Sequence, residues 1–315
     1  MHNISIDIFL KIATPIVDYL CPLKYSPNRK YDNKYYLICL IDFVSRCTCW
    51  SNYNGTKEYP INGKYLNQIH NKFIKKNVYN EINKALINKY LSTGREEKLK
   101  IQCIDASFIA NKRGSIKNNN HLLNDRSKAK NKKIRKHNNK VSINKRKKEH
   151  TFIDTNRYNG RKNYFKVSTI TDSNGVPLST TIIASKEHES TGFEKTINKI
   201  PIDLKTLNNS KINRYKQNFL ADSAYHSKKI INILKKKGYN PLICYNKRNT
   251  RDAKKIKKNK FNSKDKKIYK RRFIIESFFA WIKNCPVINQ NYQKSIASYE
   301  GLFSLASSLI ICKKI

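Results

Sequence analysis

The stretch Tyr269–Lys283, YKRRFIIESFFAWIK, places a tyrosine, an arginine, a carboxylate and a lysine on one stripe of an expected helix. At about 100° per residue, Tyr269 and Lys283 each stand seven positions from Glu276, and Arg272 lies one turn before it. Apolar residues occupy much of the remaining circumference, so the helix can be buried while the polar stripe faces a cleft. These residues are Ile274, Ile275, Phe278, Phe279 and Ile282. A carboxylate flanked by cations indicates phosphate chemistry.

The order Tyr, two residues, Arg, three residues, Glu, six residues, Lys resembles the signature of bacterial-type insertion-sequence transposases, which use an Asp-Asp-Glu metal triad. That resemblance implies two upstream aspartates, each at the end of an apolar strand. Lys100–Ser107 (KIQCIDAS) is such a strand and delivers Asp105, and Asn218–Tyr225 (NFLADSAY) delivers Asp222. A single aspartate of this kind is more often a cap or turn residue. Together with the stripe, the pair predicts a catalytic and metal-binding triad of Asp105, Asp222 and Glu276.

The resemblance implies a DNA transposase that cuts strands at the ends of its element and joins the freed 3′ hydroxyl to target DNA. Two Mg²⁺ or Mn²⁺ ions per active site are expected, because these hard ions accept carboxylate and phosphate oxygens and need no His or Cys ligand. Arg272 and Lys283 are expected to grip phosphates, and Tyr269 to contact or stack near the element end. Joining two ends predicts a homodimer.

The sequence leaves two other functions open. A catalytically inactive or recruited DNA-binding protein derived from such an element would keep the fold, although binding alone does not require acidic groups in a cationic site. A structural RNA-binding protein would explain the charge and leave the two strand-end aspartates unexplained.

The chain has 315 residues and a formal net charge of +43, which predicts a polyanionic partner, most simply nucleic acid. Part of the lysine excess is also what an AT-rich coding sequence would produce. We expect the protein inside the cell with DNA, in the cytoplasm of a prokaryote or in the nucleus or viral factory of a eukaryotic host. No membrane association is expected, since Leu302–Cys312 is too short to span a bilayer.

The eight cysteines form no CxxC pair and mostly sit in apolar stretches, so they are expected to be reduced core residues. Cys47 and Cys49 form a lone C-x-C pair, for which zinc binding is the less favoured interpretation because no matching cluster lies nearby.

Residues 1–98 show apolar residues at helical spacing and predict a small all-α domain. Trp50 and the helical pair in Lys64–Leu91 resemble, more weakly, the module with which these transposases bind their DNA ends. A helical cap that only packs on the catalytic domain is the alternative.

Residues 99–315 predict an α/β domain with a ribonuclease-H-like mixed sheet flanked by helices, from the order strand, insertion, strand, strand, helix, strand, helix, strand, helix. Asn163–Thr171 and Val176–Ala184 alternate like strands and are joined by a hairpin turn, Asp172-Ser-Asn-Gly175. The basic insertion at 112–150 has almost no apolar content and is expected to stay disordered until DNA binds.

Two features depart from the family's pattern. The basic insertion is longer and more charged than expected. After the hairpin, where relatives often carry a His-Asp pair, this chain has Glu187-His188-Glu189, which leaves a fourth acidic contribution open. Neither departure changes the prediction for Asp105, Asp222 and Glu276.

Overall fold

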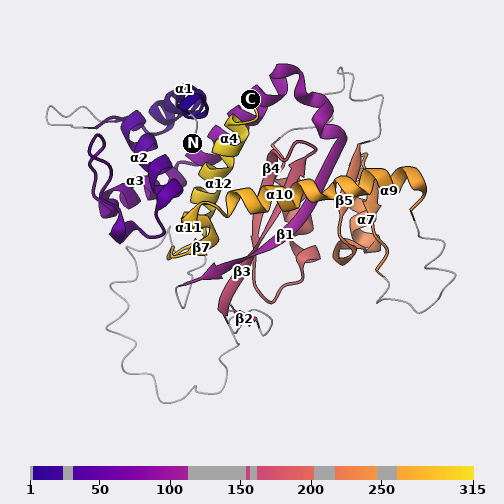
Figure 1. Cartoon of the computed structure of the whole chain (residues 1–315). Helices are drawn as coiled ribbons and strands as arrows, with labels where there is room; N and C mark the ends of the chain where they lie inside the picture. Colours follow the sequence, from indigo (N-terminus) through magenta and orange to yellow (C-terminus); the bar gives the residue numbers. More distant parts are fainter. Residues whose placement is uncertain (1–2, 24–30, 113–153, 157–161, 202–216, 247–260) are drawn as a thin grey trace, which may run out of the picture.

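A computed structural model describes residues 3–23, 31–112, 154–156, 162–201, 217–246 and 261–315 (Figure 1). Apart from its first residue, the basic insertion expected at 112–150 lies outside these residues. All eight cysteines are free, and none of the described helices is long and apolar enough to cross a membrane.

The core of the fold is a mixed sheet, and the described residues contribute seven strands to it. Its main path runs β2 (Asp154–Asn156), β3 (Lys162–Asp172), β1 (Ile101–Asn111), β5 (Asn218–Ala221) and β6 (Asn240–Ile243); β4 (Pro177–Ile183) pairs with β3, and β7 (Gln290–Asn291) pairs with β1. Strand β3 is antiparallel to both β1 and β4, whereas β5 is parallel to both β1 and β6. The predicted mixed sheet and the hairpin are confirmed.

One edge of β1 is shared by two different strands. β5 pairs with its first part, from Ile101 to Ile104, and β7 pairs with Ala110 and Asn111 near its end. None of the described strands pairs with residues 105–109 on that edge. Asp105 therefore lies inside an 11-residue strand rather than at the end of a short one, because antiparallel pairing with β3 carries β1 on to Ala110.

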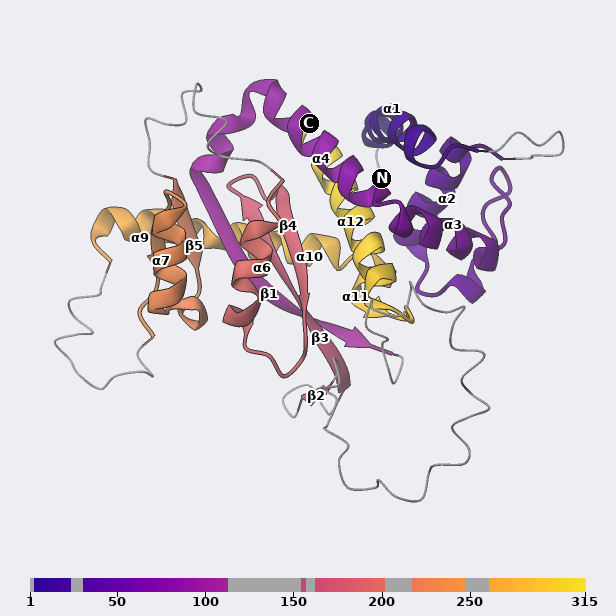
Figure 2. The same cartoon turned by 180° about the vertical axis from the view of Figure 1, so that it is seen from behind.

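Helices cover both faces of the sheet (Figures 1 and 2). On one face, α10 (Phe273–Ile282) packs across β1 and β3. On the other, α6 (Phe193–Asn198) packs on β3 and β4, and α7 (Lys228–Lys236) packs on β6. Of the predicted apolar side of α10, Ile275, Phe278, Phe279 and Ile282 are buried, whereas Ile274 is only partly buried. Short helical segments complete this part: η7 (Glu189–Gly192), η10 (Ser223–Tyr225), α9 (Ser263–Tyr269), η12 (Lys270–Arg272) and α11 (Pro286–Asn289).

The helices that precede the sheet form a group around the last helix of the chain. They are α1 (Asn3–Leu20), α2 (Asn33–Arg46), η1 (Trp50–Asn52), α3 (Gly63–Lys75), α4 (Val78–Tyr90), η2 (Leu91–Arg95) and η3 (Glu96–Lys100). The last helix, α12 (Ile296–Cys312), packs against all four α-helices of this group and also against β4. Its apolar surface is therefore shared between the N-terminal helices and the sheet.

Trp50 takes part in this packing. Its ring stacks on Phe43, with centroids 3.8 Å apart, and its indole Nε1 donates a 2.7 Å hydrogen bond to Oε1 of Gln293. These contacts support a packing role for Trp50, while DNA-end binding by residues 1–98 stays a prediction.

The β3–β4 turn is tied to α4 by a buried carboxylate. Asp172 Oδ1 accepts hydrogen bonds from the backbone N–H groups of Asn174 and Val176, at 2.8 and 2.9 Å, and its Oδ2 accepts one from the Tyr90 hydroxyl at 2.8 Å. Gly175 adopts a φ of +79°, which favours glycine at this position of the turn. One side chain thus fixes both the hairpin and the helix that leads into β1.

Replacing Asp172 by alanine is expected to lower the free energy of unfolding by about 3 kcal/mol, because buried donors lose their acceptor. Tyr90→Phe is the matched control and removes only one of these donors, so it should lower that free energy by about 1 kcal/mol. Urea denaturation measures both values. Equal losses in the two variants would contradict this account of the turn.

Candidate active site

Asp105 and Asp222 are brought side by side by the parallel pairing of β1 with β5. The last registered pair is Ile104 with Ala221, and each aspartate is the next residue along its strand direction. Neighbouring strands lie about 4.8 Å apart, and equivalent residues of parallel strands point to the same face. The two carboxylates therefore sit together where β5 ends and the edge of β1 becomes unpaired.

Asp105 is held by one backbone and one side-chain donor. Its Oδ1 accepts from the Ala106 N–H at 2.8 Å, and its Oδ2 accepts from Arg272 Nη1 at 2.9 Å. Burial raises the pKa of Asp105, and the negative charge of Asp222 adds to that rise, while the Ala106 N–H and Arg272 oppose it. The fold thus places the negative charges of Asp105 and Asp222 close together. The Arg272 guanidinium partly offsets this charge through its contact with Asp105.

Asp222 also acts as a helix cap. It precedes η10, and its side chain accepts a hydrogen bond from the backbone N–H of Ser223. This contact uses Oδ1 and orients the carboxylate at the end of β5. The cap role expected for a lone strand-end aspartate is therefore present, and it coexists with the approach to Asp105.

Glu276 and Arg272 reach this place from the crossing helix. Arg272 Nη2 donates to Glu276 Oε1 at 2.6 Å, so a single guanidinium bridges Glu276 and Asp105. Burial alone would lower the pKa of Arg272, but the charges of Asp105 and Glu276 contribute to raising it. The Glu276 side chain is 56% exposed and that of Arg272 is 22% exposed, so the glutamate is the more accessible partner.

Tyr269 fastens the same helical stretch to β5. Its hydroxyl donates a hydrogen bond to the Ala221 carbonyl oxygen at 3.2 Å, directly before Asp222, and its ring leans on Phe261 with centroids 5.0 Å apart. Burial raises the pKa of Tyr269. Three of the four stripe residues, Tyr269, Arg272 and Glu276, are thus gathered around the two aspartates.

Lys283 is not brought into this group. It caps the end of α10, where its backbone N–H donates to the Phe279 carbonyl oxygen at 3.2 Å. Its side chain is partly buried, and burial lowers the pKa of its ammonium group. No ion pair joins Lys283 to a described carboxylate of the site.

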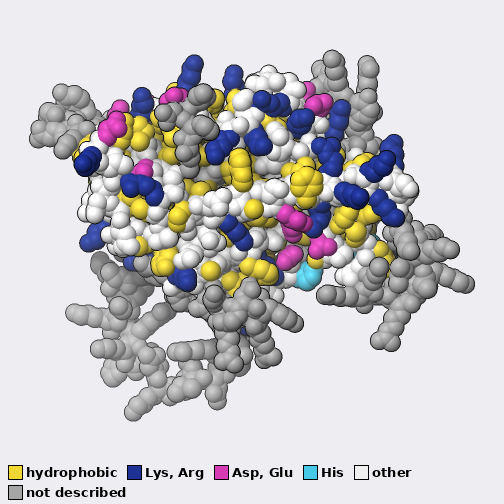
Figure 3. All heavy atoms as spheres, in the orientation of Figure 1, with side chains coloured by type: hydrophobic (Ala, Val, Ile, Leu, Met, Phe, Trp, Pro, Cys, Tyr) yellow, Lys and Arg dark blue, Asp and Glu magenta, His cyan; other side chains and the backbone are white. Residues whose placement is uncertain are grey.

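A cluster of acidic side chains lies on the face of the molecule that Figure 3 shows, where α10 crosses the β1 and β5 region. Other Asp and Glu side chains are scattered over this face, together with many separate Lys and Arg side chains. A concentration of negative charge on a chain of net charge +43 is a local feature of the fold and not of the composition.

The donor set fits a divalent metal in its chemistry, because Asp105, Asp222 and Glu276 offer only carboxylate oxygens. As the side chains stand, no three His, Cys, Asp or Glu groups among the described residues lie close enough to hold an ion. The cation between Asp105 and Glu276 is the Arg272 guanidinium. A metal ion bound by Asp105 and Glu276 would compete with Arg272 for the oxygens that the guanidinium contacts.

The sequence alone does not predict that Arg272 bridges Asp105 and Glu276. Helical spacing predicts that Arg272 meets Glu276, one turn away. It does not predict that the other nitrogen of the guanidinium reaches Asp105, because that contact depends on where α10 crosses the sheet.

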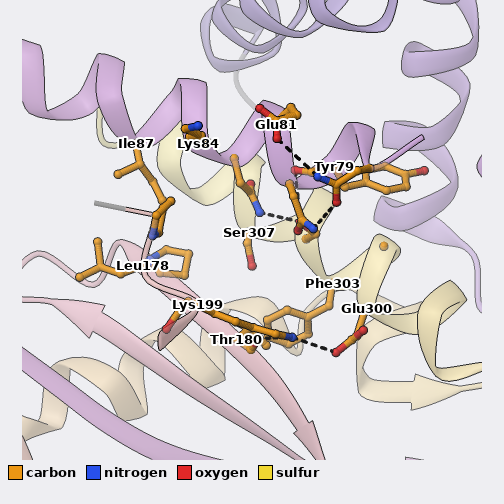
Figure 4. A pocket seen from close by; sticks show the side chains of 18 of the residues that line it. Tyr79, Glu81, Lys84, Ile87, Leu178, Thr180, Lys199, Glu300, Phe303 and Ser307 are labelled. Atoms are coloured by element: carbon orange, nitrogen blue, oxygen red, sulfur yellow. Dashed lines mark hydrogen bonds and ion pairs between the residues drawn. The ribbon is translucent and has the colours of Figure 1, made fainter. Parts of the chain in front are cut away.

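A separate hollow of about 460 Å³ lies away from the carboxylates, between α4, α12 and β4 (Figure 4). Lys199 crosses it and pairs with Glu300 at 3.5 Å, and Lys84 and Glu81 line the α4 side. Its lining has equal numbers of cationic and anionic side chains, so it lacks the concentration of carboxylates found at Asp105 and Asp222.

The mixed sheet, and the two carboxylates that adjoin where β5 ends beside β1, define a protein of the ribonuclease-H-like α/β class. Comparison with protein families then matches residues 100–311 to the transposase DDE domain. The chain belongs to this family, and the match covers β1, β5, α10 and most of α12. Comparisons with curated proteins and with solved structures find no match.

Arg272→Ala is expected to lower the free energy of unfolding by about 2 kcal/mol in metal-free buffer, because Asp105 keeps a poorly hydrated charge without a partner. Water screens the exposed Glu276, so its share of the loss is small. Thermal unfolding with and without Mg²⁺ measures the effect, and Mg²⁺ should restore part of the loss. The control is Arg271→Ala at the exposed neighbouring position. Identical midpoints for the two variants would contradict the bridging role.

Proposed function

We propose that this transposase-family protein cuts DNA strands at the ends of an insertion-sequence-type element and transfers the freed 3′ hydroxyl into target DNA. The observation that carries the proposal is the register of β1 with β5, which aligns Asp105 with Asp222 beneath the helix that bears Glu276. The Arg272 guanidinium links Glu276 of α10 to Asp105 of β1, in a protein with a formal net charge of +43.

The three carboxylates would hold two Mg²⁺ or Mn²⁺ ions, which activate the attacking oxygen and stabilise the leaving oxygen of a phosphodiester. Asp105 and Asp222 are fixed by the backbone N–H groups of Ala106 and Ser223, so their positions are set before DNA arrives. Glu276 is more exposed and completes the site from α10.

The positive side chains on the helix would place the DNA backbone. When Arg272 leaves its two carboxylates, its guanidinium has the geometry to grip a phosphate next to the cleavage point. Lys283 would bind the backbone further along, from the far end of α10. Tyr269 would contact DNA near the element end through its ring, since its hydroxyl is occupied by the Ala221 carbonyl oxygen.

Synapsis of two element ends calls for a homodimer, and the protein would act in the compartment that holds its DNA. A catalytically inactive or recruited DNA-binding protein is the second candidate. It is favoured by one observation, the occupation of the space between Asp105 and Glu276 by Arg272.

Purified protein incubated with its own gene and flanking DNA in Mg²⁺ or Mn²⁺ is expected to produce strand breaks clustered at both element ends. Asp222→Ala and Glu276→Gln should abolish the breaks while DNA binding, measured by gel shift, is retained. Breaks mapped at nucleotide resolution are the measurement, with exposed Glu97→Gln as the control variant. Tight binding without breaks would favour the inactive DNA-binder, and undiminished cleavage by Glu276→Gln would refute the three-carboxylate mechanism.

A further inference from the structure

The outward face of α10 carries an exposed tryptophan next to the carboxylates. Trp281 is 46% exposed, although tryptophan is among the side chains that bury the most apolar surface. It stands five residues after Glu276, which is about 7.5 Å further along the helix axis. Trp281 therefore lies beside the carboxylates of the site without being one of its ligands.

The helix surface between Glu276 and Trp281 is open and carries no further charge. At about 100° per residue, the exposed residues of α10 cover an arc with Glu276 at one margin and Trp281 at the other. Ser277 and Ala280 lie within this arc and are exposed, and Figure 1 shows α10 across the front of the sheet. A polymer chain can thus pass over the helix from Glu276 to Trp281 without meeting another charged side chain of α10.

Two lysines at the end of α12 lie over the Trp281 ring. Nζ of Lys313 and Nζ of Lys314 are 4.8 and 5.7 Å from the ring centroid. Their backbone N–H groups donate to the carbonyl oxygens of Leu309 and Ile311, at 3.3 and 2.8 Å, so the positions of both residues are set by the helix. Neither ammonium group forms an ion pair with a carboxylate in the described part of the chain.

An exposed indole with two unpaired ammonium groups fits an unpaired nucleobase and its phosphates. A base stacks on the flat face of an aromatic ring whatever its sequence, and only an unpaired base has a face free to do so. Lysine ammonium groups on flexible stems supply charge for the neighbouring phosphates. A membrane surface fits less well, because the exposed neighbours of Trp281, which are Ser277, Ala280 and Asn284, are small or polar and offer little apolar area for insertion.

We propose that Trp281, Lys313 and Lys314 form a docking surface for single-stranded DNA, in which the indole stacks on a base and the two ammonium groups pair with adjacent phosphates. On binding, the base takes the place of the ammonium groups over the ring, and these groups move to phosphate oxygens. The inference rests on the proposed function in its choice of DNA as the nucleic acid, whereas the stacking and the charge pairing do not depend on a metal ion.

The test measures binding of a fluorescein-labelled oligo-dT strand and of a labelled hairpin duplex to the full chain, by fluorescence anisotropy with EDTA present. Trp281→Ala is expected to weaken oligo-dT binding about tenfold, which corresponds to the loss of one base–aromatic stack, and to leave duplex binding unchanged. Trp281→Phe keeps an aromatic ring and should retain most of the affinity. The control is Tyr19→Ala, which removes an aromatic side chain of α1 that is 86% exposed and should change neither affinity.

Trp281 also supplies an optical signal of its own, because the chain has only two tryptophans. In a Trp50→Phe variant the tryptophan fluorescence comes from Trp281 alone, and oligo-dT should quench it as a base stacks on the indole. Replacing Lys313 and Lys314 together by glutamine should lower the slope of the logarithm of oligo-dT affinity against the logarithm of salt concentration by about 1.4, since each phosphate contact to a single strand contributes about 0.7.

The outcomes separate failure of this inference from failure of the proposed function. If Trp281→Ala binds oligo-dT like the wild type, or if oligo-dT leaves Trp281 fluorescence unquenched, the docking surface is refuted and the proposed cleavage at element ends stands. If the wild-type chain binds neither DNA, the proposed function fails as well. Equal losses of strand and duplex binding in Trp281→Ala would make Trp281 a structural residue. Binding to phosphatidylserine vesicles that Trp281→Ala abolishes, with oligo-dT binding intact, would assign the surface to a membrane; both results overturn the inference.

Discussion

The parallel register of β1 with β5 is the constraint on which the site depends. Ile104 pairs with Ala221, so Asp105 and Asp222 emerge as neighbours. A shift of one residue would send one carboxylate to the opposite face, because side chains alternate along a strand. The register is supported by buried residues on both strands, among them Cys103 and Leu220. Apolar packing in the sheet thus determines the distance between two groups that repel each other.

The repulsion between Asp105 and Asp222 destabilises the fold unless positive charge offsets it, and Arg272 provides part of that positive charge. Its two contacts reach a carboxylate on β1 and another on its own helix, so it offsets charge and holds α10 against the sheet at once. Lysines elsewhere on the surface cannot do this, since water and salt screen exposed charges within about 10 Å. An acidic site can therefore persist on a chain of net charge +43.

Much of this arrangement could be predicted from the sequence, because it depends on local pattern. The β3–β4 hairpin follows from alternation and a glycine-containing turn, and the buried side of α10 follows from helical spacing. The length of β1 could not be predicted in this way. Asp105 lies within a long strand because β3 pairs with residues beyond it, and pairing between distant segments leaves no local mark. Helical spacing likewise does not predict that Lys283 forms no ion pair with a described carboxylate of the site.

The position of that crossing is set by two polar contacts that bracket the aspartates. Tyr269 binds the last carbonyl group of β5, and Arg272 binds Asp105 on β1, so the helix is fastened to both parallel strands within one turn. Glu276, one turn further on, has only the Arg272 contact and is largely exposed. Asp105 and Asp222 are thus held by backbone N–H groups, whereas Glu276 is held only by a side chain. In the proposed function, cations and a phosphate would bind between the two held carboxylates and the more exposed one, without any change in the sheet.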